Sequence, residues 1–315
     1  ARGRLRSDVA GDGVPDADLV IEAIFEDKDA KQELYRKLEP KMKDGAVLAT
    51  NTSSIRLEEL RTALDAPARL IGLHFFNPVA QLPLVEVIRC ADTEAEAVDA
   101  GHAFVKAIGK YPLECASSPG FVVNRVLAPY MGEAMRLHEE GVALETIDRA
   151  AVEFGMPMGP VELADSVGLD VAWHVSTILA DAYGYPLPEK LKEMVDAGHL
   201  GRKSGRGFYR WEDGEAEKRS DPEGPEPPDL QDRLILPMVN EAVACLAEGV
   251  VEDEELLDAG VIFGTGFAPF RGGPLHYARS RGVEEVRTRL EKFAMEYGER
   301  FRPAGGWDAF TADGE

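Results

Sequence analysis

The chain has 315 residues, of which 44% are hydrophobic, and its formal net charge is −22 at pH 7. This length allows two or three domains, each with a core of its own. The negative charge argues against nucleic acid as a partner, because binding to phosphates requires clustered Lys and Arg side chains. No apolar run is long enough to span a bilayer, and the basic start Ala1–Arg4 has no apolar segment behind it that would make a secretory signal.

The cysteines and the first residue give two further expectations. Cys90, Cys115 and Cys245 share no metal-ligand spacing and form no disulfide framework, so we expect no metal site and a reducing, cytoplasmic setting. The sequence starts at Ala1 rather than at methionine, and we expect this to be a cut end.

The first third of the chain alternates between strand-like and helix-like segments. Asp18–Glu26, Gly45–Thr50 and Arg69–His74 contain short apolar runs typical of buried parallel strands. Asp29–Lys43, between the first two of these runs, has apolar residues at helical spacing. This alternation predicts a doubly wound α/β domain.

The dinucleotide-binding half of such a domain opens with a Gly-x-Gly-x-x-Gly turn between a strand and a helix. Gly11 and Gly13 stand before Val14–Pro15, with no strand-like run ahead of them and no helical pattern behind. We therefore expect only the later half of a Rossmann-type domain, over residues 1–117, without the glycine-rich loop.

From residue 118 onward the pattern is helical. Apolar spacing predicts helices over residues 124–140, 144–154, 161–182 and 187–197. Residues 212–229 are rich in Pro, Glu, Asp and Gly, and this composition predicts a linker.

Beyond the linker the chain repeats itself. Arg125–Ala134 is echoed by Arg233–Ala242, Glu140–Gly141 by Glu248–Gly249, and Gly159–Pro160 by Gly273–Pro274. A duplicated helical unit is the economical explanation. The predicted fold class is therefore a partial Rossmann-type α/β domain followed by two all-α helical repeat domains, over residues 118–211 and 230–315. The second copy has Asp232 where the first has Asn124, which indicates a structural copy rather than a second active site.

One histidine and one glutamate stand in two neighbouring strand-like runs. His74 lies in Gly-Leu-His-Phe-Phe-Asn-Pro, residues 72–78, and Glu86 lies in Leu-Val-Glu-Val-Ile, residues 84–88. A histidine held by a carboxylate is the usual general base near neutral pH. A single histidine beside a strand is more often a packed or surface residue, so the hypothesis depends on the two motifs taken together.

With Asn51–Ser54 upstream and Pro119–Arg125 downstream, these motifs resemble the L-3-hydroxyacyl-CoA dehydrogenase family over nearly the whole chain. The resemblance implies NAD-dependent oxidation of (S)-3-hydroxyacyl-CoA to 3-oxoacyl-CoA in fatty acid β-oxidation. His74 matches the general base of the family and Glu86 the carboxylate that orients it.

Ser53 and Asn124 match the family's hydrogen-bonding pair at the substrate oxygen. Taken alone, Asn51–Ser54 would also serve as a helix N-cap ahead of Leu57, and Asn124 would be a residue at a helix start. Asn51–Ser54 could serve in both roles, with one serine binding the substrate oxygen and the other capping the helix.

Ala23, Glu26, Lys31 and Asn77 match positions that line the nicotinamide and ribose side of the family's NAD site. Without the resemblance, Glu26 and Lys31 would be interpreted as a solvated charge pair at a helix start. The pyrophosphate cradle would lie before Ala1, so we expect the chain to bind NAD weakly or not at all.

The second helical repeat resembles the fused multifunctional members of the family, the alpha-subunit type of fatty-acid oxidation, truncated here at the N-terminus. This resemblance implies 3-hydroxyacyl-CoA and 3-oxoacyl-CoA as substrate and product, and a thiolase subunit or a second copy of the chain as candidate partners. Two alternatives stay open. One is a hydroxy-acid or sugar-acid dehydrogenase on the same scaffold, and the other is a catalytically silent fragment that serves as a dimerisation or thiolase-docking module.

Overall fold

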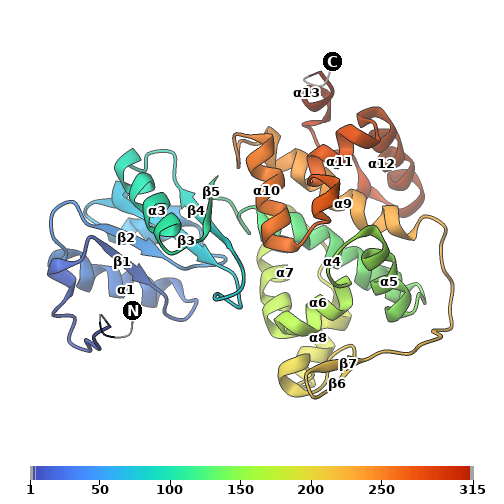
Figure 1. Ribbon diagram of the computed structural model, residues 1–315, viewed down its shortest axis with the longest axis horizontal. Helices are drawn as coiled ribbons and strands as arrows, with labels where there is room; N and C mark the ends of the chain where they lie inside the picture. Colours follow the sequence, from blue (N-terminus) through green and yellow to red (C-terminus); the bar gives the residue numbers. More distant parts are fainter. Residues whose placement is uncertain (1–2, 4, 313–315) are drawn as a thin grey trace. The chain divides into compact units, whose positions relative to one another are not determined.

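The computed structural model describes residue 3 and residues 5–312, which are drawn in Figure 1. The chain divides into two compact units. Residues 1–79 and 83–118 form the α/β unit, and residues 80–82 and 119–315 form the helical unit. Each unit is described by itself.

The α/β unit is built on a sheet of five strands in the order β1-β2-β3-β4-β5. The strands are β1 (Leu19–Glu22), β2 (Val47–Thr50), β3 (Leu70–Phe75), β4 (Leu84–Arg89) and β5 (Tyr111–Ala116). β1, β2 and β3 are parallel, β4 is antiparallel to β3, and β5 is parallel to β4. The first three strands confirm the predicted alternation, whereas the reversal at β4 makes the sheet mixed rather than wholly parallel.

A single long helix, α3 (Ala95–Ala107), packs against β3, β4 and β5 (Figure 1). The core between them contains Ile71, Leu73 and Val87, each with no solvent exposure. Gly101 permits this close packing, because a Cβ atom placed on it would lie 2.7 Å from Ile71 Cδ1. Burial of this apolar face stabilises the unit through the hydrophobic effect.

The other helices of the α/β unit comprise α1, which has 11 residues, and several of three or four residues. They are η2 (Val14–Asp16), α1 (Lys28–Leu38), η3 (Glu39–Lys41), α2 (Leu57–Leu60), η4 (Arg61–Ala63) and η5 (Pro67–Arg69). α1 begins after Asp27, whose side chain accepts the Ala30 N–H at 2.8 Å. The predicted extension of this helix to Lys43 is wrong, because Pro40 has no amide hydrogen to continue it and the chain tightens into η3.

The helical unit contains two groups of helices joined by a long connection. The elements are α4 (Val123–Glu139), α5 (Leu144–Phe154), α6 (Pro160–Val167), α7 (Leu169–Tyr183), α8 (Glu189–Asp196), η6 (Arg202–Ser204), β6 (Arg210–Glu212), β7 (Glu215–Glu217), α9 (Leu230–Ala247), α10 (Glu254–Thr265), η7 (Pro269–Arg271), α11 (Pro274–Arg281), α12 (Val283–Tyr297), η8 (Glu299–Phe301) and α13 (Trp307–Ala312). The single helix predicted over residues 161–182 is wrong. Gly168 has φ +108° and ψ 128°, which is not a helical conformation, and separates α6 from α7.

The predicted linker over residues 212–229 begins with regular structure instead. β6 and β7 form an antiparallel hairpin through Asp213 and Gly214, whose φ angles are 49° and 85°. Two successive left-handed residues of the Asp-Gly type are favoured in two-residue hairpin turns. After β7, the chain runs along the outside of the helical unit to α9 (Figure 1). Arg219 is ion-paired with Glu145 along this path.

The two predicted repeats lie together in one compact unit, with α4 packed against α9. Their capping interactions are equivalent. Asp148 accepts the Val161 N–H at the start of α6 at 2.8 Å, and Asp258 accepts the Leu275 N–H at the start of α11 at 2.7 Å. In the described part of the chain, no helix is both long and apolar enough to cross a membrane.

Candidate active site

The carboxyl ends of β1, β2 and β3 lie at one edge of the sheet, since the three strands are parallel. Ligands bind at this edge in open α/β sheets. β1 is followed by Ala23–Asp27, β2 by Asn51–Ser54, and β3 by Phe76–Asn77. Asn51 links the segment after β2 to the end of β3, because its Oδ1 accepts the Phe75 N–H at 3.1 Å.

His74 and Glu86 are direct partners in the antiparallel ladder of β3 and β4. The imidazole Nδ1 lies 2.7 Å from Glu86 Oε2. His74 is only 6% exposed and Glu86 is fully buried. An ionised carboxylate can only accept, so Nδ1 carries the hydrogen and Nε2 carries the lone pair of the neutral ring. The Phe76 ring packs edge-on against the imidazole, with the centroids 4.5 Å apart. The Glu86 carboxylate and the Phe76 ring together fix the orientation of the imidazole.

Ser53 lies in the turn that follows β2. Its backbone N–H donates to Glu26 Oε1 at 3.0 Å. The hydroxyl groups on either side of it, those of Thr52 and Ser54, also donate to Glu26 Oε1. Among the described residues, no group bonds to the Ser53 hydroxyl, so this hydroxyl is available to a ligand.

The alternative role of Asn51–Ser54 as the cap of the next helix is not what the structure shows. Arg56 occupies the N-cap position of α2 and makes no side-chain capping bond. The first amide of the helix, Leu57 N–H, donates to Ser117 Oγ at 3.2 Å. Thr52 Oγ1 instead accepts the Ile55 N–H at 3.0 Å, inside the turn itself.

Lys31 and Glu26 do not form a solvated pair. The Lys31 side chain has no solvent exposure, and its Nζ lies 2.8 Å from Glu22 Oε1 and 3.4 Å from Glu26 Oε2. Glu22 also accepts hydrogen bonds from the Tyr35 hydroxyl at 2.9 Å and from Thr50 Oγ1 at 2.8 Å. A buried cation is tolerated here because two carboxylates compensate its charge.

Three of these residues, Glu22, Tyr35 and Thr50, were missed by the sequence reasoning. The available signal was a charged residue that closes an apolar strand, together with a lysine and a tyrosine four residues apart on one helix face. The consequence for Glu26 is electrostatic. Burial raises the pKa of Glu26, but the hydrogen bonds from Thr52 and Ser54 and the charge of Lys31 outweigh burial and leave that pKa below its ordinary value.

The other predicted residues are less enclosed. Ala23 and Asn77 are exposed and follow β1 and β3. Phe25, beside Ala23, is 71% exposed. Asn124 is the second residue of α4 and is half-buried in the helical unit, so it belongs to a different unit from His74. The α/β unit therefore contains the sequence-predicted residues His74, Glu86, Ser53, Glu26, Lys31, Ala23 and Asn77, and direct contacts join His74 to Glu86 and join Ser53 and Lys31 to Glu26.

A glycine-rich dinucleotide loop is not found among residue 3 and residues 5–312. Asp8 accepts the backbone N–H groups of Gly11 and Gly13 at 2.9 and 2.7 Å, and the three-residue helix η2 follows. These glycines precede β1 and do not join a strand to an α-helix. The described residues therefore contain no cradle for the pyrophosphate of a dinucleotide, whereas the residues predicted for its nicotinamide side include Ala23 and Asn77 in the exposed segments after β1 and β3.

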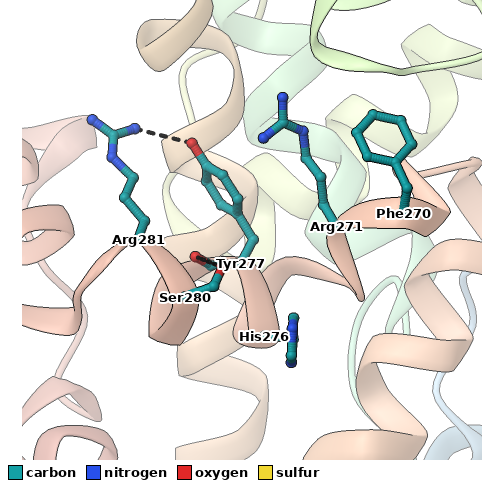
Figure 2. A pocket seen from close by; sticks show the side chains of 6 residues that line it. All are labelled: Phe270, Arg271, His276, Tyr277, Ser280 and Arg281. Carbon is teal, nitrogen blue, oxygen red and sulfur yellow. Dashed lines mark hydrogen bonds between the residues drawn. The ribbon is translucent and has the colours of Figure 1, made fainter.

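A hollow of about 500 Å³ in the second helical repeat is a separate feature (Figure 2). It is lined by Phe270, Arg271, His276, Tyr277, Ser280 and Arg281. Arg281 donates to the Tyr277 hydroxyl and is ion-paired with Asp232. None of the sequence-predicted site residues lines this hollow. In the described ranges, no group of three His, Cys, Asp or Glu side chains is arranged to hold a metal ion.

Comparison with family models gives two adjoining matches. Residues 1–118 match the model described as 3-hydroxyacyl-CoA dehydrogenase, NAD binding domain. Residues 120–211 match the model described as 3-hydroxyacyl-CoA dehydrogenase, C-terminal domain. The boundary between the two matches coincides with the boundary between the two compact units.

Similar curated proteins include fatty acid oxidation complex subunit alpha of Shewanella amazonensis, which is 38% identical over 96% of this chain. The chain spans 45% of the length of that relative. Among solved structures, 3-hydroxybutyryl-CoA dehydrogenase from Escherichia coli K12 has a TM-score of 0.82 at 30% identity, with 95% of this chain and 82% of that chain covered. The dehydrogenase part of multifunctional enzyme 1 from C. elegans has a TM-score of 0.65 at 30% identity, with 93% and 71% covered.

Proposed function

Since the chain belongs to the 3-hydroxyacyl-CoA dehydrogenase family, we propose that it catalyses the NAD-dependent oxidation of an (S)-3-hydroxyacyl-CoA to the 3-oxoacyl-CoA in fatty acid β-oxidation. The observation that carries this proposal is the 2.7 Å contact between His74 Nδ1 and the buried carboxylate of Glu86. Oxidation of a hydroxyl group requires a base for its proton, and this pair supplies one.

In the proposed mechanism, His74 Nε2 accepts the proton of the 3-hydroxyl group. Glu86 holds the ring in the required tautomer and stabilises the imidazolium that forms. NAD, held by Ala23, Glu26, Lys31 and Asn77, would supply the acceptor for the hydride that leaves C3 of the substrate. General base catalysis of this kind contributes about 10²- to 10⁴-fold to a rate.

Ser53 and Asn124 are proposed as the hydrogen-bonding partners of the substrate oxygen. The Ser53 hydroxyl is unused within the described residues, and the Asn124 amide can donate to an oxygen on which negative charge develops. Such partners hold the hydroxyl group at the base and lower the barrier by orientation as well as by charge stabilisation.

Ala23, Glu26, Lys31 and Asn77 are proposed to hold NAD on its nicotinamide side. Ala23 and Asn77 are exposed at the sheet edge where ligands of this fold bind. Lys31 has no solvent exposure, so its contribution is proposed to pass through Glu26. Phe25, in the same segment after β1 as Ala23 and Glu26, is exposed and offers an apolar surface.

A substrate panel tests the reaction class. The chain is incubated with NAD and (S)-3-hydroxybutyryl-CoA, its (R) isomer, and free hydroxy acids and sugar acids, and NADH formation is followed by absorbance. We expect turnover of the (S)-thioester well above that of every other compound. Faster turnover of a free hydroxy acid or sugar acid would favour a different dehydrogenase on the same scaffold.

A protein partner is a separate proposal. The curated relatives are named subunits of a complex, and the chain spans less than half of their length. We propose that this chain binds a thiolase subunit or a second copy of itself. Light scattering with and without a thiolase subunit tests it, and binding without any turnover in the substrate panel would favour the silent docking module.

A further inference from the structure

The turn after β2 carries three neighbouring hydroxyl groups, and two of them are already used. Thr52 Oγ1 and Ser54 Oγ both donate to Glu26 Oε1, the latter at 2.8 Å. The Ser53 hydroxyl between them has no bond among the residues that the structure describes. The Thr52 and Ser54 hydroxyls are thus structural, whereas the Ser53 hydroxyl can bind a ligand.

Glu26 is the centre of this turn. Besides the two hydroxyls, its Oε1 accepts the backbone N–H groups of Ser53 and Ser54 at 3.0 and 3.1 Å. Four donors from three consecutive residues thus converge on one carboxylate oxygen. Hydrogen bonds to a charged acceptor are stronger than those between neutral groups, so the turn is fixed mainly by this one side chain.

The other oxygen of Glu26 is tied to the core of the α/β unit. Oε2 lies 3.4 Å from Lys31 Nζ, and Lys31 is anchored in turn by Glu22. Glu22 sits at the end of β1 and receives hydrogen bonds from Tyr35 and Thr50. A continuous polar connection therefore runs from buried positions of β1, α1 and β2 through Glu26 to the backbone of Ser53.

We propose that Glu26 is the positioning residue of Ser53: its carboxylate fixes the turn of residues 52–54 and thereby directs the Ser53 hydroxyl toward the substrate oxygen. This inference rests on the proposed function for the role of Ser53. It assigns to Glu26 a task in the chemical step, beyond its place beside NAD. A displacement of about 1 Å at a positioned group can cost about 10²-fold in rate.

The test distinguishes a role of Glu26 in holding the turn of residues 52–54 from a role in holding NADH. The double variant Thr52→Val/Ser54→Ala removes two donors from the turn and leaves the Glu26 side chain in place. Reduction of acetoacetyl-CoA by NADH is then measured as kcat and as the KM for NADH. We expect kcat to fall about tenfold or more while the KM for NADH stays within about twofold, since loss of two bonds to a charged acceptor loosens the turn alone.

Two substitutions of Glu26 and one control complete the design. Glu26→Gln keeps an oxygen that can accept from the turn, so we expect it to recover most of the kcat that Glu26→Ala loses. Glu33→Gln on α1 is the matched control, because Glu33 is 67% exposed and pairs with Lys37 at the surface. An unchanged kcat in the double variant, with Glu26→Ala raising only the KM for NADH, would show that Glu26 serves the cofactor alone and would overturn the proposal.

A second readout is independent of turnover. Hydrogen exchange of the Ser53 and Ser54 amides is measured in the wild-type chain and in Glu26→Ala. We expect exchange to become about tenfold faster or more at these two amides, while β2 residues 47–50 keep their protection. If the wild-type chain shows no turnover, the proposed function fails, yet this measurement still decides whether Glu26 holds the turn. Unchanged exchange at Ser53 and Ser54 would contradict the positioning role even in an active enzyme.

Discussion

Arg233 on α9 reaches Glu133 on α4, with Nε 2.8 Å from Glu133 Oε1, and both side chains are 2% exposed. The reverse contact is also present, because Arg125 on α4 donates to Glu241 on α9 at 2.6 Å. Each arginine belongs to one repeat and each glutamate to the other. The two predicted repeats therefore contact each other through equivalent arginine and glutamate positions, within one compact unit.

The first prediction concerns the buried ion pair between Arg233 and Glu133. Arg233→Met leaves Glu133 with Arg300 as its remaining ionic partner and removes the cation from a buried position. We expect the free energy of unfolding to fall by about 3 kcal/mol. This value is at the lower end of the range of about 3–5 kcal/mol for removal of one partner of a buried pair. Urea unfolding followed by circular dichroism measures it. Arg302→Met, at a side chain that is 70% exposed, is the control and should change the value by less than about 0.5 kcal/mol.

The second prediction concerns the buried lysine of the α/β unit. Lys31→Met should leave Glu22 and Glu26 without their cation and lower the free energy of unfolding by about 3 kcal/mol. Lys37→Met removes a lysine that is 66% exposed from the same helix, and a change below about 0.5 kcal/mol is expected there. Equal effects of the two substitutions in chemical denaturation would contradict the compensation of Lys31 by the two carboxylates.

The third prediction is a pH dependence that originates at the start of α11. Burial raises the pKa of Asp258 from 3.8 to about 6, against the hydrogen bonds from the Leu275 and His276 amides, which lower it. A raised carboxyl pKa means that the native state keeps a proton that the unfolded state has lost. The stability linked to this proton is complete below about pH 4 and is lost as the pH rises through about 6.

Asp258→Asn removes this titration and keeps one acceptor for the helix cap. Between about pH 5 and about pH 7.5, we expect the wild-type chain to lose about 1 kcal/mol of unfolding free energy relative to the variant. Groups that titrate in both proteins cancel in the difference. A difference between wild type and variant that is constant over this range would refute a raised pKa at Asp258.

The sequence was informative wherever a motif and a local pattern agreed. His74 and Glu86 stand in two adjacent strand-like runs, and the antiparallel ladder of β3 and β4 places them opposite each other. The Lys31–Glu22 pair was not predicted, because the sequence does not show whether a charged residue of a helix faces the solvent or the core. Only the packing of α1 against the ends of β1 and β2 decides that question.

Two further differences have local causes. The break at Gly168 depends on a backbone conformation that apolar periodicity does not encode, so residues 161–182 resemble one helix. The hairpin of β6 and β7 did carry a signal, the Asp213–Gly214 pair, but the high content of charged residues around it favoured a linker. Composition therefore described residues 218–229 correctly as a connection without helix or strand and missed only the hairpin at its start.

The fourth prediction addresses the orienting carboxylate. Glu86→Gln can present an amide hydrogen to His74 Nδ1, which would move the ring hydrogen to Nε2 and remove the proton acceptor. We expect kcat for acetoacetyl-CoA reduction to fall by about 10²-fold or more, with the KM for NADH little changed. Glu114→Gln, on the neighbouring strand β5 and half-exposed, is the control that should leave kcat unchanged. Retention of full activity in Glu86→Gln would remove Glu86 from the mechanism.

The most direct test of the account is the rate of acetoacetyl-CoA-dependent NADH oxidation by the wild-type chain and by His74→Ala, with His276→Ala as a control at an exposed histidine. Because the described residues contain no pyrophosphate cradle, NADH is supplied at high concentration; we then predict measurable turnover in the wild-type chain and in the control, and a loss of at least about 10²-fold in His74→Ala. Turnover that survives in His74→Ala within about twofold would contradict the assignment of His74 as the catalytic base, and a folded wild-type chain without turnover would contradict the proposed dehydrogenase activity of this chain.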